Sequence, residues 1–447
     1  MGKSRRSRVP KEPVQAEIRD LSHEGRGITE VDGKTVFVAG ALPDETVTFL
    51  YRKRHRRYDD AAVQQIDQPS ARRIEPRCPH FGVCGGCSLQ MLSSDDQIAF
   101  KQDVLLEQFQ RFGKVIPETV LPPLRSTPWG YRRKARLGVK NVPAKGRVLV
   151  GFRERFSPFV ADMRECHVLN PQVGFLLEDL SALIGALSRP DRVPQIEVSI
   201  GDNAVALVFR NLEPWSESDI AALATFAQQH DIQVWGQPGN ESTVHPIWPE
   251  QPALYYSPGD SGIRLDFLPT DFTQVNADLN GRMLELALDL LAPQPTERFL
   301  DLFCGLGNFT LPLARRCDHV VGVEGAASLV ERARQNAQAN GISNAEFHAA
   351  DLAAEGVDQL PWLRQPFDGI LLDPPRSGAA EVLPALAALG APRIVYVSCN
   401  PATLARDAGT LVHDHGYTLR KAGVMDMFPH TAHVESIALF ERKAFKV

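Results

Sequence analysis

The final 185 residues, from 263 to 447, alternate short apolar runs with segments of helical pattern, and this alternation constrains the fold more than any other feature. Runs such as Phe299–Leu302 and His319–Glu324 have the pattern of buried strands. Alternating strands and helices are typical of a doubly wound parallel sheet, whose ligands bind beyond the carboxyl ends of the strands. We therefore expect a C-terminal α/β domain of Rossmann-like architecture.

A glycine-containing turn follows the first of these strands. Gly305 and Gly307 stand between the strand and the expected helix, where glycine lets the backbone approach a ligand closely. A dinucleotide fingerprint needs a third glycine, but Thr310 occupies that position. The turn therefore argues against NAD as the ligand.

Acidic residues end the next three expected strands. Glu324 suits the two hydroxyl groups of a ribose, Asp351 is placed to meet an adenine amino group, and Asp373 follows the fourth strand. These features in this order predict a site for S-adenosylmethionine (SAM), although an α/β domain with incidental acids is the alternative. Amino-group methyltransferases place an aromatic residue after Asp-Pro-Pro, whereas this chain has Arg376, a cation suited to a phosphate or carbonyl oxygen.

A cysteine follows another apolar run, Arg393–Val397, within Ser398-Cys399-Asn400-Pro401. A residue on an Asn-Pro turn at a strand tip is presented rather than packed, although a lone cysteine is more often a small buried hydrophobic residue. Beside a methyl donor, a thiolate could add to carbon 6 of a uracil and make carbon 5 nucleophilic. The motif therefore predicts Cys399 as a catalytic nucleophile.

This chemistry also requires a general base, because the proton on carbon 5 must leave before the cysteine is released. Glu435, just before the expected final strand Ile437–Phe440, is our candidate, with His433 and His430 as alternatives. Upstream of the helix expected at 277–291, Gln274 could bond the cofactor or the base, and we expect Asn276 to cap that helix. Phe272 in the same segment could stack on a nucleobase.

Four of the seven cysteines have the spacing of a metal site. Cys78, Cys84 and Cys87 give C-x5-C-x2-C, and Cys166 follows after 78 further residues. Three close thiolates and one remote thiolate favour a [4Fe-4S] cluster over zinc, whose ligands usually come as two CxxC pairs. With all four positions filled by protein, we expect a structural or RNA-contacting cluster rather than a radical initiator.

The part of the chain ahead of the α/β domain divides by composition. Residues 1–13 form a basic arm, and short alternating runs across 14–68 predict a small β-barrel of the oligonucleotide-binding kind. Residues 69–124 hold the cysteine loop and a linker helix at 95–112, with Ile98, Val104, Leu105 and Phe109 on one side. Residues 125–262 mix strands with helices, which are expected at 173–187 and 217–229, in an α+β domain. Residues 125–155 carry ten Lys and Arg against one Glu, which indicates a polyanion-binding surface, although a solvated face is the commoner meaning of a charge run.

Overall composition sets broad limits. No stretch approaches the 18 apolar residues of a membrane span, and the basic start is not followed by an apolar signal region. An odd number of cysteines with metal-like spacing points to a reducing cytoplasm. No symmetric apolar surface is legible, so we expect a monomer.

Together these motifs resemble the RNA 5-methyluridine methyltransferases over nearly the whole chain. The resemblance rests on four features: Asp301-Leu-Phe-Cys-Gly-Leu-Gly-Asn-Phe309, Asp373-Pro-Pro-Arg376, Ser398-Cys-Asn-Pro401 and the four spaced cysteines. It implies a TRAM domain at 14–68, a [4Fe-4S] cluster on Cys78, Cys84, Cys87 and Cys166, Cys399 as nucleophile and Glu435 as base. The cofactor contacts that it implies are Gln274, Phe303, Asn308, Glu324, Asp351 and Asp373, of which Asp351 is Asn in some relatives.

The arrangement of domains selects among branches of this family. A TRAM domain together with a cluster is similar to a branch that methylates a specific uridine of 23S rRNA. The tRNA branch usually lacks both, and another branch, which methylates a different site of the large-subunit rRNA, has the cluster but little ahead of it. Two other classes stay open. A non-catalytic RNA-binding iron–sulfur protein would leave Cys399 unused, and an exocyclic-amine methyltransferase would not need Cys399.

Overall fold

The computed structural model describes residues 9–354 and 360–442, which form two compact units. Of the described residues, the first unit comprises 9–101, 151–163 and 428–433, and the second unit comprises the others. Residues 1–8, which make up most of the predicted basic arm, lie outside the described residues.

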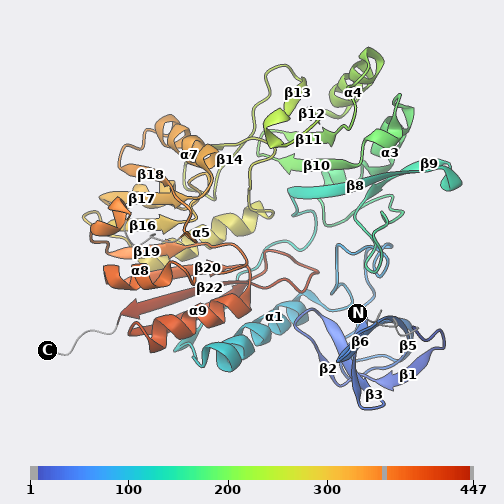
Figure 1. Cartoon of the computed structure of the whole chain (residues 1–447), viewed down its shortest axis with the longest axis horizontal. Helices are drawn as coiled ribbons and strands as arrows, with labels where there is room; N and C mark the ends of the chain where they lie inside the picture. The colour runs from blue at the N-terminus through green and yellow to red at the C-terminus, as the bar shows by residue number, and fades with distance from the viewer. Residues whose placement is uncertain (1–8, 355–359, 443–447) are drawn as a thin grey trace, which may run out of the picture. The chain divides into compact units, whose positions relative to one another are not determined.

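The first unit contains a curled six-stranded sheet with strand order β1-β5-β6-β4-β3-β2 (Figure 1). Its inner face packs Val36, Val38, Val47 and Phe49 into a core. The sequence did not predict β3, because Gly25 and Gly27 read as turn residues. A Cβ at Gly27 would lie 2.8 Å from Ile18 Cγ2, so glycine is needed there for close packing within the sheet. The strands are β1 Val14–Glu17, β2 Asp20–Leu21, β3 Arg26–Val31, β4 Lys34–Ala39, β5 Thr46–Arg54 and β6 Tyr58–Gln68.

A single helix, α1 (Ser94–Gln108), begins in the first unit and ends in the second. Ile98, Val104, Leu105 and Phe109 are all buried, as their helical spacing predicted. The last turn widens into a π-helix at Phe109–Gly113, after which Lys114 takes a left-handed conformation with φ of 52°.

The second unit begins with a mixed six-stranded sheet of order β13-β12-β11-β10-β8-β9. The predicted helix 173–187 is two helices, because the chain leaves helical geometry at Phe175 and Leu176. The elements are β8 Lys134–Val142, β9 Arg147–Gly151, α2 Pro171–Gly174, α3 Leu177–Ala186, β10 Gln195–Ile200, β11 Val205–Arg210, α4 Glu217–His230, β12 Gln233–Gln237 and β13 His245–Trp248.

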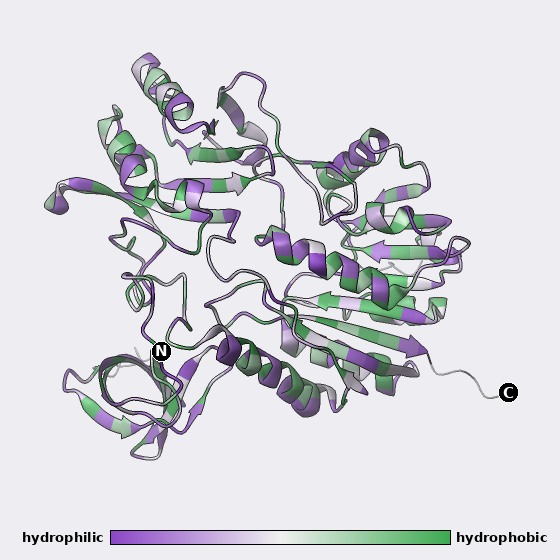
Figure 2. Ribbon diagram, turned by 180° about the vertical axis from the view of Figure 1, so that it is seen from behind, coloured by the Kyte–Doolittle hydropathy of each residue, from purple (hydrophilic) through white to green (hydrophobic). Residues whose placement is uncertain are grey.

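The C-terminal part of the second unit is an eight-stranded sheet of order β18-β17-β16-β19-β20-β22-β21-β7 (Figure 1). We predicted a parallel sheet, but β22 is antiparallel to both of its neighbours, since a hairpin from β21 inserts it beside β20. In Figure 2 the strands of this sheet are mostly green, whereas the helices around it carry both colours. The strands are β7 Thr119–Val120, β16 Arg298–Leu302, β17 His319–Glu324, β18 Ala345–Ala349, β19 Gly369–Leu372, β20 Arg393–Ser398, β21 Tyr417–Met425 and β22 Glu435–Arg442.

The helices of this C-terminal part follow its strands, as the alternating pattern predicted. Asn276 caps the first helix through a bond from the Leu279 N–H (3.2 Å), which confirms the capping role read from the sequence. The helices are α5 Ala277–Leu291, α6 Thr310–Ala314, α7 Ala327–Ala339, α8 Leu383–Leu389 and α9 Pro401–His413. No helix in the described ranges is both long and apolar enough to cross a membrane.

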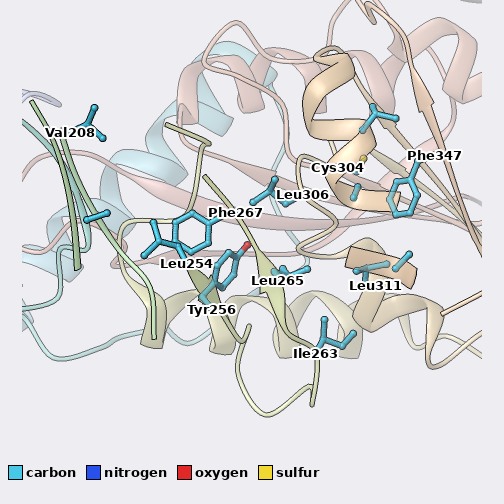
Figure 3. Close-up of a cluster of buried hydrophobic side chains, with 14 of the residues drawn as sticks. Val208, Leu254, Tyr256, Ile263, Leu265, Phe267, Cys304, Leu306, Leu311 and Phe347 are labelled. Atoms are coloured by element: carbon cyan, nitrogen blue, oxygen red, sulfur yellow. The ribbon is translucent and has the colours of Figure 1, made fainter. Parts of the chain in front are cut away.

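A hairpin of β14 (Tyr255–Tyr256) and β15 (Leu265–Asp266) joins the two sheets of the second unit. Its buried side chains Leu254, Tyr256 and Phe267 pack in one cluster with residues of both sheets. Figure 3 shows Val208 from β11 on one side of this cluster, Phe347 from β18 on the other, and Leu306 between them. This shared core fixes the mixed sheet relative to the glycine turn after β16.

Candidate active site at the sheet edge

The carboxyl ends of five parallel strands meet at one edge of the large sheet. Phe303, Glu324, Asp373 and Cys399 end or directly follow β16, β17, β19 and β20. Strand order reverses at β16, with β17 on one side and β19 on the other, and this switch point is where doubly wound sheets bind ligands. The structure therefore collects the predicted strand-end residues along a single edge.

The turn after β16 has the conformation that its glycines allow. Phe303, Gly305 and Gly307 all have positive φ, at 64°, 55° and 93°. A Cβ at Gly305 would meet nothing within 4 Å, so open space lies beside this backbone. The turn can therefore accept a ligand without displacing protein atoms.

Glu324 is held by the backbone rather than by a cation. Its Oε2 accepts from the Gly305 N–H at 3.2 Å, and its Oε1 accepts from the Ala326 N–H at 3.0 Å. Each carboxylate oxygen keeps further acceptor capacity, which suits the paired hydroxyls of a ribose. By contrast, Asp351 lies two residues beyond β18, where its Oδ1 accepts from the Ala353 N–H at 2.9 Å.

Asn308, a predicted cofactor contact, makes three side-chain hydrogen bonds within the protein. Its Oδ1 accepts from the Asn280 amide at 2.9 Å and from the Tyr256 hydroxyl at 3.2 Å, and its Nδ2 donates to Asn280 Oδ1 at 3.0 Å. These bonds fasten the glycine turn to α5 and to the β14–β15 hairpin. Any contact with a cofactor would have to use the second proton on Nδ2.

A residue not predicted as part of the site, Asp301, lies fully buried within β16. Its Oδ2 accepts from the Thr310 hydroxyl at 2.5 Å, while its Oδ1 is buried with no hydrogen-bond partner. Burial raises its pKa to about 7, and the nearby charges of Asp373 and Glu324 act in the same direction. The signal in the sequence was an acid inside an apolar strand with Thr310 nine residues later.

Asp373 follows β19, and its side chain is half-buried. Its backbone N–H donates to the Leu302 carbonyl at 3.4 Å, which keeps it beside the end of β16. Burial raises the pKa of Asp373 to about 7, so this carboxyl group can hold or release a proton near neutral pH.

Cys399 and Glu435 are next to each other in the strand register. Ser398, the last residue of β20, pairs with Ser436, the second residue of β22. The next position along each strand is Cys399 on one side and Glu435 on the other. The pKa of the Cys399 thiol is raised to about 11, mainly by burial; Glu435 and Asp373 act in the same direction and Arg376 acts against them. Glu435 itself is 5% exposed.

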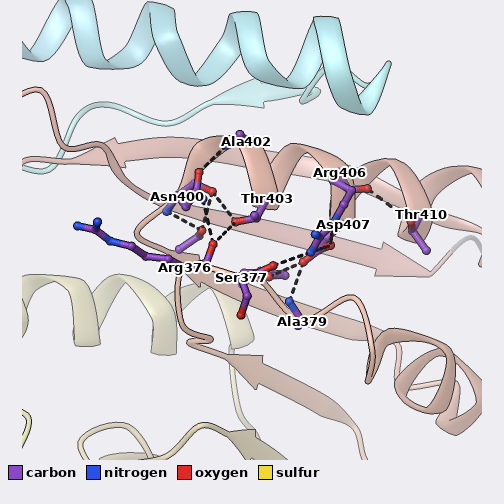
Figure 4. Close-up of polar contacts among 11 residues, drawn as sticks. Arg376, Ser377, Ala379, Asn400, Ala402, Thr403, Arg406, Asp407 and Thr410 are labelled. Carbon is purple, nitrogen blue, oxygen red and sulfur yellow. Dashed lines mark hydrogen bonds and ion pairs between the residues drawn. The ribbon is translucent and has the colours of Figure 1, made fainter. Parts of the chain in front are cut away.

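The loop after Asp373 is fastened to the helix that follows Cys399, as Figure 4 shows. The Arg376 carbonyl accepts from Asn400 Nδ2 at 2.9 Å and from the Thr403 hydroxyl at 3.3 Å. Deeper in, Asp407 accepts from the Ala379 N–H at 2.9 Å and from the Tyr396 hydroxyl at 2.7 Å. The Arg376 side chain is exposed and points away from α9, so it takes no part in this network. Its positive charge lowers the pKa of the Cys399 thiol.

A lysine of the mixed sheet holds the segment that carries Gln274. Lys134 on β8 donates to the carbonyl oxygens of Pro269 and, at 3.1 Å, Asp271. Gln274 is half-buried and Phe272 is 69% exposed, so neither side chain is enclosed by the protein. Sequence reasoning assigned Lys134 to a basic surface, but it is largely buried and its pKa is lowered by that burial.

Three predicted metal ligands share one loop of the first unit. Cys84 is buried and its Sγ accepts from the Gly86 N–H at 3.3 Å, while Cys78 and Cys87 are half-buried. Cys166 belongs to the second unit, where it is buried and its N–H donates to the Gly174 carbonyl at 2.8 Å. Across the described ranges, no group of three or more Cys, His, Asp or Glu side chains is arranged to hold a metal ion, so the ligand set stays a prediction.

The sheet order, the glycine turn and the strand-end acids have the arrangement of the methyltransferase fold. A family model described as tRNA (Uracil-5-)-methyltransferase matches residues 207–443, which is more than half of the chain. The chain therefore belongs to this family of uracil-5 methyltransferases.

Full-length relatives carry more specific names. A protein of Alkalilimnicola ehrlichii named 23S rRNA (uracil(1939)-C(5))-methyltransferase RlmD is 60% identical over 99% of this chain and 100% of the relative. A protein of the same name from Xanthomonas campestris pv. campestris is 52% identical over 98% of this chain and 99% of the relative. A Pyrococcus abyssi tRNA (uracil-54, C5)-methyltransferase, solved with S-adenosyl-L-homocysteine, shares the fold. It has a TM-score of 0.73 and 24% identity over 96% of this chain and 100% of that chain.

Proposed function

We propose that this protein transfers the methyl group of SAM to carbon 5 of one uridine in 23S rRNA, the position numbered 1939 in the names of its relatives. The observation that carries the proposal is the adjacency of Cys399 and Glu435 in the β20–β22 register, at the edge that also presents Glu324 and Asp373. A nucleophile, a base and a nucleoside site at one sheet edge are what carbon-5 methylation requires.

SAM is a substrate that the reaction consumes, and the predicted contacts for it are Gln274, Phe303, Asn308, Glu324, Asp351 and Asp373. Glu324 is fixed by two backbone N–H groups, so it presents its remaining lone pairs in a defined direction. Open space beside Gly305 leaves room for the ligand between Glu324 and the turn. Asp373 lies on the same edge, between this site and Cys399.

Addition and proton removal, the two steps that need a protein group, can then be assigned to Cys399 and Glu435. The Cys399 thiolate adds to carbon 6 of the uracil and forms a carbon–sulfur bond, which makes carbon 5 an enolate carbon. Carbon 5 takes the methyl group, and the sulfonium leaves as a neutral thioether. Glu435 then removes the carbon-5 proton, and the electron pair expels Cys399 as the methylated base is released. Because the resting thiol has a pKa of about 11, the exposed cation of Arg376 is suited to stabilise the thiolate.

Trapping with 5-fluorouridine tests this chemistry. A base cannot remove fluorine as a cation, so the adduct between the protein and 23S rRNA fragments should survive on a denaturing gel when SAM is present. Cys399→Ala should give no adduct, and mapping the crosslink should name the uridine. An adduct on tRNA but not on rRNA would support the second candidate substrate, which the names of the family model and of the Pyrococcus abyssi protein suggest. No adduct on either RNA would overturn the proposal.

We also propose a [4Fe-4S] cluster held by Cys78, Cys84, Cys87 and Cys166. The N–H···S bond from Gly86 to Cys84 supports it, since backbone donors stabilise thiolate ligands. A side chain at Gly85 would come within 3.0 Å of the Arg153 carbonyl, so this glycine lets the thiolate loop pack closely on that backbone. Iron and sulfide analysis of anaerobically purified protein tests the cluster. About four of each per chain is expected, with loss in Cys84→Ser. One zinc and no sulfide would overturn it.

The curled sheet and the exposed cations fit an RNA-binding role. We propose that the sheet at 14–68 is the TRAM domain of the protein. The side chains of Arg136 and Lys140 are exposed and lie four residues apart on β8, so they point to the same face of the strand. An rRNA substrate and cysteines that form no disulfides in the described structure also lead us to propose a cytoplasmic location.

A further inference from the structure

The loop that joins β21 to β22 leads directly into Glu435, and its centre belongs to the first unit. Met425 and Glu435 face each other where the two strands begin to pair, so residues 426–434 form the connecting loop. Phe428–His433 within this loop clusters with the N-terminal residues, whereas Glu435 belongs to the large sheet. The chain therefore passes from one unit to the other two residues before the proposed base.

Within the first unit, the loop is held at Phe428, whose carbonyl accepts from Lys101 Nζ at 2.9 Å, and most closely at His430. The His430 carbonyl accepts from the Ser88 N–H at 2.8 Å and from the Leu89 N–H at 2.9 Å, and its own N–H donates to Gln97 Oε1 at 2.7 Å. The Ala432 N–H also donates to the Ser88 hydroxyl at 3.0 Å. These contacts of His430 and Ala432 join the loop to Ser88–Gln97, the segment that directly follows Cys87.

Gln97 is buried, and its whole side chain is committed to this contact. Since Oε1 accepts from the His430 N–H, the amide nitrogen must serve the other two contacts, with the Leu92 carbonyl at 2.9 Å and His430 Nδ1 at 3.2 Å. An amide donor facing Nδ1 fixes that nitrogen as the acceptor of the ring. The side chain of Gln97 therefore sets both the backbone and the ring orientation of His430.

The backbone at His430 is also strained. Its φ is 67°, in the left-handed region that residues other than glycine seldom adopt. Such a conformation persists only where the surroundings over-determine it, and here main-chain and side-chain bonds from Ser88, Leu89 and Gln97 do so. A strained residue that is held this firmly, five positions before Glu435, defines the path along which the chain enters β22.

We propose that Gln97 is a positioning residue for Glu435, so that the N-terminal unit sets the geometry of proton removal from carbon 5. The inference rests on the proposed function, because it takes Glu435 as the base. Gln97 acts through the loop and His430, not on the substrate. Cys399 is reached through β20, which takes no part in this loop, so addition of the thiolate should not depend on Gln97.

The test separates addition from elimination by using unmodified rRNA fragments, SAM and a denaturing gel. In Glu435→Gln, addition and methyl transfer proceed but the proton stays, so the protein–RNA adduct should accumulate. Gln97→Ala should show the same accumulation, with turnover reduced on the order of 100-fold and adduct formation unchanged. Ser88→Ala removes only the bond to the Ala432 N–H and should give a smaller accumulation. Glu107→Gln, on the exposed face of the same helix, should behave like the unaltered protein.

The outcomes distinguish the inference from the function on which it rests. If Glu435→Gln gives turnover without accumulation, the proposed base is wrong and the function must be revised. The positioning role is overturned if Glu435→Gln accumulates adduct while Gln97→Ala and Ser88→Ala do not. Thermal melting and SAM binding must show that these two variants are folded. If Gln97→Ala does not fold, Ser88→Ala decides the matter by the same readout.

Discussion

Ser398 and Ser436 face each other across β20 and β22, and the Ser436 hydroxyl donates to the Ser398 carbonyl at 3.2 Å. This bond lies one residue from Cys399 on one strand and one residue from Glu435 on the other. The pairing of two buried serines therefore sets the distance between the proposed nucleophile and the proposed base. A change in this register by one residue would turn Glu435 to the opposite face of the sheet.

Adduct formation should depend on the protonation of Cys399. Its pKa is raised to about 11, so the thiolate fraction rises with pH throughout the range from 7 to 9, about tenfold for each unit. The rate of trapping on 5-fluorouridine RNA should follow this rise. Arg376 lowers the pKa, so Arg376→Gln should shift the profile to higher pH. Arg420→Gln, an exposed cation on β21, is the matched control, and equal profiles for both variants would contradict the role of Arg376.

Stability should fall as the pH rises through the titration of Asp301. Its folded pKa is raised to about 7, so the folded chain holds this proton more tightly than the unfolded chain does. The stabilising contribution is complete below the ordinary carboxyl range and is lost as pH rises through about 7. Asp301→Asn should therefore show a smaller fall in Tm between pH 5 and pH 8. Asp278→Asn, exposed on α5, should keep the full fall, and parallel curves for both variants would count against the raised pKa.

Two buried tyrosines offer a matched comparison of hydrogen bonds. The Tyr396 hydroxyl donates to the Asp407 carboxylate at 2.7 Å, and the Tyr417 hydroxyl donates to the Ala391 carbonyl at 2.8 Å. A bond to a charged group is worth more, so Tyr396→Phe should cost about 2–3 kcal/mol of unfolding free energy and Tyr417→Phe about 1 kcal/mol. Denaturant unfolding measures both. An equal or reversed order would mean that Asp407 finds another donor.

Removing Lys134 should weaken SAM binding through the segment that carries Gln274. Lys134→Met deletes the donors to Pro269 and Asp271, so Gln274 should lose its fixed position. We expect KM for SAM to rise about tenfold, equivalent to about 1.4 kcal/mol, with a smaller change in kcat. Arg136→Met, whose side chain is 68% exposed on the same strand, is the control for charge loss. An unchanged KM for SAM would mean that Lys134 does not position the segment that carries Gln274.

The parts of the fold that were predictable are those with local signals. The length and order of β17 and α5 followed from periodicity, and Asn276 was recognisable as a cap because a capping side chain bonds residues next to it. The reversed direction of β22 was not predictable, since strands of either direction carry the same apolar pattern. The Gln97–His430 contact joins residues 333 positions apart and leaves no mark on the local sequence.

For the candidate site, the sequence identified candidate catalytic residues but not the side chains that surround them. Cys399 and Glu435 were predicted as separate residues, and the register makes them neighbours, although their catalytic roles stay predictions. The engagement of Asn308 with Asn280, and the burial of Asp301, depend on how α5 and the glycine turn pack. Packing of that kind is a property of the assembled chain, so residue identity alone could not reveal it.

The single reversed strand of the large sheet has a topological consequence. If β22 ran in the same direction as β20, its first residue would lie at the opposite edge of the sheet, roughly 25 Å away for a strand of this length. Glu435 could then reach Cys399 only by a long detour of the chain. Insertion of one antiparallel strand instead lets the beginning of β22 meet the end of β20. The two residues proposed for addition and for proton removal therefore enter the sheet from opposite directions.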